Sequence, residues 1–346
     1  MKFGYLSKKS HYLEKLRNSY IMNAYGYSLM PKISITEILI VKPRFFYIDD
    51  HISFIELVKI LLSFYFKFID KVVLRCSELY TIDYHAYSTE VDNYLLTLKD
   101  QNKNTIINKI WSIRVYFKIW IFRLILNNKN TILFLPSVLR KEYFDLRSNL
   151  KNTTIVLRNL PMADELNFTK ISFSESFDSK TSDILNSKNF FLLAGRINSF
   201  EDLVIISEYS NKNNTPIVIA SDDTTSVINL KKIFPNNILF IGMVDHNVIL
   251  NLVYNCSAGI ILYNNQTVNQ RLSASSKLFE FLYFNKPVIV SDNQGVIYEL
   301  NAESYPHRIL INKDLLFNDF LFTADNAKFH FENEVSSLNN LLSNCI

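Results

Sequence analysis

Glycine, proline and cysteine are all scarce in this chain of 346 residues, which contains six glycines, eight prolines and three cysteines. The cysteines, Cys76, Cys256 and Cys345, lie far apart in the sequence and form no CxxC pair. This spacing indicates neither a disulfide framework nor a zinc site, and it fits a protein of the reducing cytoplasm.

Common nucleotide-binding and hydrolytic motifs are missing as well. The sequence contains no P-loop, GxGxxG, HExxH or GxSxG, which excludes the usual NTPase, dehydrogenase, zinc-protease and serine-hydrolase assignments. Carboxylates in IDDH (48–51) and SDD (221–223) follow apolar runs and are of the type that Mg²⁺ prefers. An Asp at a strand end is more simply a helix N-cap or a turn residue, so we expect no metal and no cofactor.

Charge of one sign is not concentrated in this chain. The formal net charge of +4 is mild for this length and falls short of the basic face of a nucleic-acid binder, so we expect no nucleic-acid partner. The first 18 residues, MKFGYLSKKSHYLEKLRN, are charged throughout and lack the apolar core and cleavage site of a signal peptide. Export is not expected, and we expect a cytoplasmic protein.

Long uninterrupted apolar runs are absent too. The two most apolar segments, 52–69 and 110–126, are broken by charged residues before they reach the roughly 18 apolar residues that span a bilayer. The second segment, IWSIRVYFKIWIFRLIL, is aromatic and has only cationic interruptions, a composition that suits anionic headgroups. On a helix, Arg114 and Lys118 fall on one side and Arg123 nearly opposite. A buried core helix and a peripheral contact with the inner face of the plasma membrane both remain open.

The chain is long enough for two domains, because a single core stops growing near this size. Apolar residues make up 48% of it and charged residues 20%, as in globular proteins. In the second half, short apolar runs alternate with helix-length segments. This alternation predicts buried parallel strands covered by helices, the doubly wound α/β class. The predicted strands are FFLLA (190–194), PIVIA (216–220), ILFIG (238–242), GIILY (259–263), PVIVS (287–291) and RILI (308–311).

The first half follows a similar order. A capping box, SITE (34–37), predicts a short helix. The further predicted elements are strand 44–48, helix 52–69, strand 71–75, helix 104–127, strand 131–135, a helix from 137 and strand 153–157. Residues 166–189 are rich in Ser, Asp, Lys and Asn, which predicts a linker. We therefore expect an N-terminal domain (1–165), a C-terminal domain (190–325) and a final helix (326–346), with a cleft facing the carboxyl ends of both sheets.

The stretch SASSKLFEFLYFNKPVIVSDNQG (273–295) concentrates the scarce turn residues. Ser275 or Ser276 can cap a helix that begins at Lys277, and a Lys-Pro pair ends this helix before a strand. The helix N-terminus then points toward the cleft. Its backbone N–H groups and positive dipole end form a site for a diphosphate, to which the two hydroxyls add donors and Lys277 adds charge.

Glu280 lies about one turn into the same predicted helix. A carboxylate at that position can accept two hydrogen bonds from a vicinal diol, as acidic residues do with ribose in dinucleotide folds. The simpler alternative is an ordinary i, i+3 ion pair between Lys277 and Glu280 on the protein surface.

The Ser-x-x-Lys-Leu-Phe-Glu helix and following Lys-Pro-Val-Ile strand of this stretch resemble the nucleotide-sugar motif of GT-B glycosyltransferases of family 4. FFLLAGR resembles the first strand of the family's donor domain, and ILFIGMVDHNVILNLVYNCSAGIILYNN is similar to its base-binding strand, helix and next strand. IDYHAYSTE (82–90) resembles an Asp-x-His-Glu segment, and TIVLRNLP (154–161) an Asn-x-Pro exit from the acceptor domain. The matches follow the family's order over most of the chain.

The resemblance implies a GT-B fold, in which two Rossmann-like domains face each other across a cleft. It also implies sugar transfer from a nucleotide sugar with retained anomeric configuration and without a bound metal. The implied donor-binding residues are Gly195, Arg196, Gly242, Ser275, Ser276, Lys277 and Glu280, and the implied catalytic residues are His85, Arg196 and Lys277.

The chain departs from the family pattern at several positions. A glutamate usual eight residues before Glu280 is replaced by Leu272, and the glutamate of Asp-x-His-Glu is replaced by Ala86. The lysine usual shortly after Arg196 is missing, and the glycine-rich turn near the N-terminus is reduced to Gly4. The replacement by Leu272 affects contacts to the donor sugar. The missing lysine leaves the charge of the diphosphate to Arg196, Lys277 or another residue.

We therefore expect a glycosyltransferase that builds a bacterial surface polysaccharide, such as O-antigen or capsule, on a lipid-linked saccharide acceptor. Two alternatives stay open. A sugar-nucleotide epimerase of the same fold would act on the donor without any acceptor. A non-catalytic GT-B partner subunit would explain Leu272 and Ala86 and would bind donor weakly or not at all.

Overall fold

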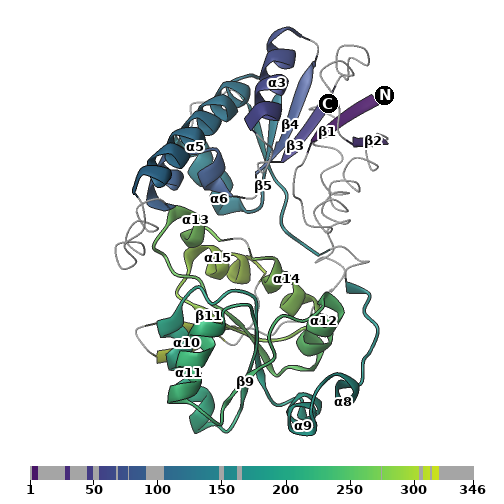
Figure 1. The fold of residues 1–346 in the computed structure, drawn as a ribbon, viewed down its shortest axis with the longest axis vertical. Helices are drawn as coiled ribbons and strands as arrows, with labels where there is room; N and C mark the ends of the chain where they lie inside the picture. The colour runs from purple at the N-terminus through teal and green to yellow at the C-terminus, as the bar shows by residue number, and fades with distance from the viewer. Residues whose placement is uncertain are drawn as a thin grey trace. The chain divides into compact units, whose positions relative to one another are not determined.

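The protein is divided into two compact units (Figure 1). In the computed structural model, the described residues are 2–6, 28–31, 45–49, 54–67, 69–76, 78–90, 105–147, 152–161, 166–273, 275–303, 307–311 and 314–318. Unit 1 comprises the described residues up to Arg158 together with the segment Gln266–Leu272. Unit 2 comprises the described residues of Asn159–Asn265 and those from Ser273 onward.

Unit 1 is built on a six-stranded sheet of order β2-β1-β3-β4-β5-β6, in which every neighbouring pair is parallel. Its strands are β1 (Lys2–Leu6), β2 (Ser28–Pro31), β3 (Phe45–Asp49), β4 (Lys71–Arg75), β5 (Thr131–Leu135) and β6 (Thr153–Val156). Its helices are α3 (Phe54–Tyr65), the 3-10 turn η1 (Leu79–Thr81), α5 (Thr105–Leu126) and α6 (Val138–Arg147). All residues of β5 are buried, as expected for a parallel strand covered on both faces.

Unit 2 has a seven-stranded sheet of order β13-β12-β11-β10-β7-β8-β9, parallel except for the edge pair β12–β13. Its strands are β7 (Phe191–Ala194), β8 (Ile217–Ala220), β9 (Ile238–Phe240), β10 (Ala258–Ile261), β11 (Val288–Ser291), β12 (His307–Ile311) and β13 (Asp314–Asn318). Its helices are α8 (Phe173–Ser176), α9 (Ser179–Ser187), α10 (Phe200–Lys212), α11 (Thr224–Ile233), α12 (His246–Asn255), α14 (Ser276–Tyr283) and α15 (Gln294–Ala302). Helix α13 (Val268–Arg271) belongs to the segment that unit 1 contains.

Both units are Rossmann-like and doubly wound, which confirms the predicted fold class. In unit 2 the chain adds β8 and β9 on one side of β7, then returns to place β10, β11 and β12 on the other. The strand order therefore reverses between β7 and β10. In open parallel sheets, ligands bind beyond the carboxyl ends of the strands at such a switch point.

The six strands predicted in the second half correspond to β7 through β12, within a few residues at their ends. In the first half, the four predicted strands correspond to β3, β4, β5 and β6, and the helices to α3, α5 and α6. Strands β1, β2 and β13 were not predicted. The capping box at 34–37 and the final helix at 326–346 lie outside the described residues.

The polar segment 166–189, predicted as a linker, is not an extended connection. It contains α8 and α9 and lies within unit 2. The backbone of Thr169 bonds to two asparagines of α12, accepting from Asn251 Nδ2 at 2.9 Å and donating to Asn247 Oδ1 at 2.9 Å. The few apolar side chains of the segment, including Phe173 and Leu185, are buried. The composition of the segment did not reveal these apolar residues, because each of them stands alone among polar residues.

Within the described residues, no helix is both long and apolar enough to cross a membrane. Of the three cysteines, Cys76 and Cys256 are buried free thiols, and Cys345 lies outside the described residues. Burial raises the pKa of the Cys256 thiol to about 12, which keeps it protonated and unreactive at neutral pH.

Helix α14 packs closely on β10 through Gly259. A Cβ added at this glycine would lie 2.6 Å from the ring of Phe281, which is fully buried on α14. Only a residue without a side chain fits between this strand and the ring. Gly259 therefore sets how closely α14 approaches the sheet.

We predict that Gly259→Ala lowers the free energy of unfolding by about 1–3 kcal/mol, because the added methyl group overpacks the core. Urea unfolding followed by far-UV circular dichroism measures the change. Phe281→Leu supplies the control background, since a smaller side chain leaves room for the methyl. An equal loss in both backgrounds would show that the contact with Phe281 is not the cause.

Candidate functional site

The carboxyl edge of the unit 2 sheet collects the loops that follow β7, β10 and β11. At the switch point, Asn264 Nδ2 in the loop after β10 donates to the carbonyl of Asn198 in the loop after β7, at 2.9 Å. Gly195 and Arg196 begin the β7 loop, and both are exposed. In the site predicted from sequence, the side-chain amide of Asn264 therefore holds the β7 and β10 loops together.

Two predicted donor-binding glycines adopt backbone conformations that L-residues rarely take. Gly195 has a φ of +119° and Gly242, after β9, a φ of +71°. A Cβ at either position would meet no atom within 4 Å, so packing does not explain the glycine. Glycine at these two loop positions serves the turn itself and leaves the backbone open to an approaching ligand.

Helix α14 begins at Ser276, one residue earlier than predicted, with Ser275 as its N-cap. The prediction of a serine cap was wrong in one respect, since the hydroxyl of Ser275 makes no capping hydrogen bond. In α15, by contrast, Asn293 Oδ1 accepts from the N–H of Val296 at 3.1 Å. The first-turn N–H groups of α14 therefore keep their capacity for an anion.

Lys277 and Glu280 form a two-pronged ion pair. Lys277 Nζ donates to Glu280 Oε1 at 2.9 Å and to Oε2 at 2.8 Å. The Glu280 side chain is only 7% exposed and that of Lys277 30% exposed. The simpler expectation of an i, i+3 ion pair is confirmed, but the pair does not lie wholly on the surface. The carboxylate is buried, so its removal from water must be offset by this cation.

Sequence reasoning missed a polar network at the end of β11. Ser291 Oγ donates to the carbonyl of Tyr263 at 2.7 Å and accepts from its N–H at 2.9 Å. Asn265 Nδ2 donates to the carbonyl of Asp292 at 2.5 Å. The available signal was the Ser-Asp-Asn run at the end of a buried strand. These bonds tie the β10 and β11 loops on either side of the α14 segment.

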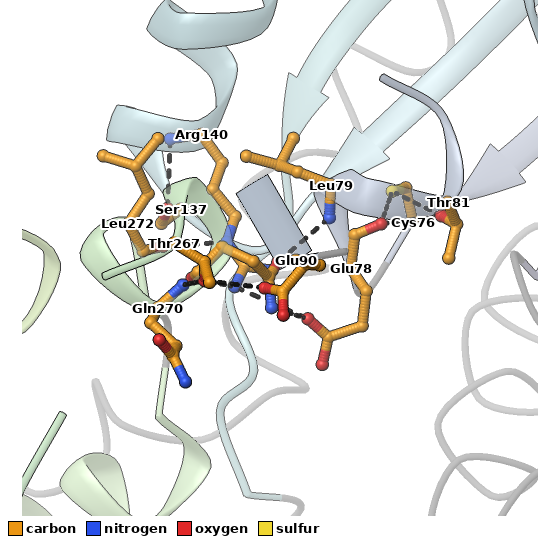
Figure 2. Close-up of polar contacts among 11 residues, drawn as sticks. Cys76, Glu78, Leu79, Thr81, Glu90, Ser137, Arg140, Thr267, Gln270 and Leu272 are labelled. Carbon is orange, nitrogen blue, oxygen red and sulfur yellow. Dashed lines mark hydrogen bonds and ion pairs between the residues drawn. The ribbon is translucent and has the colours of Figure 1, made fainter. Parts of the chain in front are cut away.

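A second polar cluster lies in unit 1, where the segment Gln266–Leu272 is held by Arg140 of α6 (Figure 2). Arg140 is buried; its Nε donates to the carbonyl of Leu272 at 2.8 Å and its Nη2 to that of Asn269 at 3.2 Å. Glu78 Oε2 lies 3.8 Å from Arg140 Nη2 and accepts from Asn269 Nδ2. We refer to this group, Glu78, Glu90, Arg140 and Gln266–Leu272, as the Arg140 cluster.

Glu90 completes the Arg140 cluster on its other side. Its Oε1 accepts from Thr267 Oγ1 at 2.6 Å, and Thr89 Oγ1 accepts from the N–H of Val268 at 3.2 Å. Burial raises the pKa of the Glu90 carboxyl, and the negative charge of Glu78 adds to this rise. The segment is thus bound through its backbone and through side chains from three elements of unit 1.

The two departures from the family's acidic pattern share one hydrophobic core. Leu272 and Ala86 are both buried members of the same apolar cluster of unit 1, which also includes Phe122 and Phe144. A carboxylate at either position would be transferred from water into largely apolar surroundings, which costs free energy. The apolar residues at these positions are therefore part of the packing of unit 1.

His85 lies in the first turn of a short helix, and its residue is exposed. Asp83 caps this helix, since its Oδ1 accepts from the N–H groups of His85 at 3.0 Å and Ala86 at 2.9 Å. Asp83 itself is buried and receives the hydroxyl of Tyr143 at 3.1 Å. The Asp of the IDYHAYSTE segment thus has a structural role that leaves the imidazole of His85 accessible.

A metal site is not formed by the described residues, among which no group of three His, Cys, Asp or Glu side chains could hold an ion. Asp223 of the SDD segment caps α11, accepting from Ser226 N at 3.0 Å, as the simpler interpretation of that segment expected. The absence of a metal requirement stays a prediction.

We predict that Arg140→Met lowers the free energy of unfolding of unit 1 by about 2–5 kcal/mol, because two backbone carbonyls lose their donor and Glu78 loses its ion-pair partner. The two tryptophans of the chain, Trp111 and Trp120, are both on α5, so their fluorescence during urea unfolding reports unit 1. Lys141→Met on the same helix is the control and should change stability by no more than about 0.5 kcal/mol. Equal effects of the two substitutions would contradict the role of Arg140.

No family model and no curated protein matches the chain. Its structure is similar to a sucrose-phosphate synthase from Thermosynechococcus elongatus, at 10% identity and a TM-score of 0.55 over 99% of this chain and 96% of that one. It is also similar to HepE of Anabaena, solved with UDP, at 10% identity and 0.56 over 98% and 89%. A glycosyltransferase from Rickettsia africae matches at 13% identity and 0.56 over 98% and 93%. The chain therefore has the GT-B fold, as the sequence resemblance implied.

Proposed function

We propose that the protein is a glycosyltransferase similar to those of family 4, which moves a sugar from a nucleotide sugar to a lipid-linked saccharide in surface polysaccharide synthesis, such as that of O-antigen or capsule. One observation carries the proposal. At the carboxyl edge of unit 2, the N-terminus of α14, where the Ser275 side chain makes no capping hydrogen bond, brings Ser275, Ser276, Lys277 and Glu280 together. We place the protein in the cytoplasm, where nucleotide sugars are made.

The chemistry would be departure of the nucleotide diphosphate from the anomeric carbon. The electron pair of the broken bond goes to the diphosphate oxygen, and the oxygen of an acceptor hydroxyl forms the new bond while its proton passes to the departing diphosphate. Negative charge that develops on the leaving group is stabilised by the α14 dipole, by Lys277 and by Arg196. The protein needs no metal for this step if these groups supply enough positive charge. Retention of configuration is what the family resemblance implies.

The Lys277–Glu280 pair is compatible with a bound donor. An ammonium group has three N–H donors, and Lys277 uses two of them on Glu280. The carboxylate has about four acceptor positions, of which Lys277 occupies two. We propose that the third donor of Lys277 binds the diphosphate and that the remaining positions of Glu280 accept the ribose hydroxyls. Both bonds then form without breaking the pair.

We predict that nucleotide sugars raise the melting temperature of the protein, since a ligand at about 100 times its Kd stabilises by roughly 2.7 kcal/mol. Glu280→Gln should weaken donor affinity about tenfold or more, because charged hydrogen bonds to the diol are lost. A thermal-shift experiment with UDP- and GDP-sugars measures the melting temperature. Calorimetric titration with the same sugars measures the affinity, with Glu208→Gln on the exposed face of α10 as the control. A Glu280→Gln variant that is less stable but binds donor normally would reduce Glu280 to a structural role.

His85 is the residue that we propose to contact the transferred sugar or the acceptor. His85→Ala should lower the maximal rate by about 10²-fold while donor affinity changes little, since a positioned catalytic group acts in the transition state. The melting temperature should stay nearly constant because the residue is exposed. Steady-state kinetics beside a melting curve test this. Full turnover in the variant, or activity lost only through unfolding, would remove His85 from the catalytic residues.

A non-catalytic role as a GT-B partner subunit is the second candidate. It is favoured by the burial of Leu272 and Ala86, which occupy positions where the family has carboxylates, in the core of unit 1. Donor binding separates the two functions. A protein that responds to no nucleotide sugar in the thermal-shift experiment fits the partner subunit.

A further inference from the structure

Helix α14 lacks the side-chain cap that several helices of unit 2 have. The hydroxyl of its N-cap residue, Ser275, makes no capping hydrogen bond, whereas Asp178, Asp223 and Asn293 provide such bonds for α9, α11 and α15. A capping bond holds the residue before a helix in a defined conformation against the first turn. The position of the backbone that enters α14 is therefore left to other contacts.

The residues just before α14 are held in unit 1 by the Arg140 cluster (Figure 2). Arg140 Nε donates at 2.8 Å to the carbonyl of Leu272, three residues before Ser275. The side chain of Leu272 is buried in the core of unit 1. Three residues of extended chain span at most about 11 Å. Only a short stretch of backbone thus separates the N-cap of α14 from a fixed point in unit 1.

The anchored segment is internally ordered as well. Thr267 Oγ1 accepts from the N–H of Gln270 at 3.1 Å and so caps the short helix α13. The N–H of Leu272 donates to the carbonyl of Val268 at 3.0 Å. Thr267 also donates to Glu90 at 2.6 Å, so one hydroxyl both caps α13 and attaches it to unit 1. A turn of helix therefore joins the two ends of the segment.

The chain enters this segment directly from the carboxyl edge of unit 2. Asn264 Nδ2 donates to a carbonyl of the β7 loop, and Asn265 Nδ2 donates to one of the β11 loop. The next residue, Gln266, already belongs to unit 1, and Thr267 follows with its bond to Glu90. The segment is therefore not a flexible linker, because bonded residues lie directly before it and within it.

We propose that Arg140 is a positioning residue for the donor site. Its side chain is only 5% exposed, so it acts through the carbonyl of Leu272, which fixes the backbone from which α14 starts. The first-turn N–H groups and Lys277, which we propose to bind the diphosphate, are then held in place before a donor binds. A site ordered in advance binds more tightly, because the ligand does not have to order it.

This inference rests on the proposed function and deepens it, since it adds a residue of unit 1 to the determinants of donor binding. The alternative is that Arg140 only stabilises unit 1. The two roles differ in what the loss of Arg140 does to α14, which belongs to unit 2. A stability-matched substitution elsewhere in unit 1 separates them. Ile60→Ala supplies it, because Ile60 is fully buried on α3.

Hydrogen exchange of the backbone amides in the full chain without ligand is the first test. In Arg140→Met we expect faster exchange in the segment 266–272 and in α14. In Ile60→Ala we expect faster exchange in the strands of unit 1 and wild-type rates in α14. Unchanged exchange of α14 in Arg140→Met, or an equal rise in Ile60→Ala, would overturn the positioning role.

Donor affinity is the second test, measured by calorimetric titration with nucleotide sugars at a temperature at which every variant is folded. Arg140→Met should raise the Kd about fivefold or more, a usual size for coupling between separate sites. Asn269→Ala should act in the same direction, because it releases the segment from Glu78 and from the N–H of Leu79 while Arg140 stays in place. Ile60→Ala and Lys141→Met should bind the donor as the wild type does.

The two tests distinguish failure of this inference from failure of the proposed function. A wild type that binds no nucleotide sugar removes the proposed transferase, and hydrogen exchange alone then decides whether Arg140 orders the start of α14. A wild type that binds donor, with Arg140→Met binding it equally well, leaves the transferase standing and overturns the role of Arg140.

Discussion

The structure depends on one buried guanidinium. Arg140 of α6 donates to the carbonyls of Asn269 and Leu272, residues about 130 positions later in the chain. Together with those from Glu78 and Glu90, these bonds hold the segment Gln266–Leu272 in unit 1. In the sequence, this segment lies between β10 and α14 of unit 2. The start of α14, where the proposed donor site lies, therefore follows directly on a segment anchored in unit 1.

Much of the fold could be predicted because parallel strands buried on both faces leave a strong pattern. The runs that became β7 to β12 are almost purely apolar, and each ends near a turn residue. Strands β1, β2 and β13 lack this signal, since KFGYL, SLMP and DLLFN are short or interrupted by polar residues and glycine. The segment 166–189 led to the opposite error, because it was predicted as a linker and forms two helices. Its polar composition hid single buried residues such as Phe173, which hold α8 on unit 2.

The site was predictable in position and less so in detail. The serines, Lys277 and Glu280 form a local motif, and a motif within eight residues can be read from sequence. The burial of Glu280 could not be predicted, because it depends on the tertiary packing of α14, which the local motif does not contain. The shared environment of Ala86 and Leu272 could not be predicted either. They are separated by most of the chain, and only the fold reveals that two isolated departures from a family pattern belong to one core.

The anchored segment also has a consequence for the order in which the protein is made. Val268 and Leu272 belong to the core of unit 1, although most of that unit precedes Arg158 in the chain. At synthesis rates of about 5–20 residues per second, roughly a hundred further residues take on the order of ten seconds to follow. During that time the nascent N-terminal half carries an unfilled apolar site and an Arg140 without its carbonyl partners. Its core can therefore be completed only after residues that are encoded behind most of unit 2 have been made.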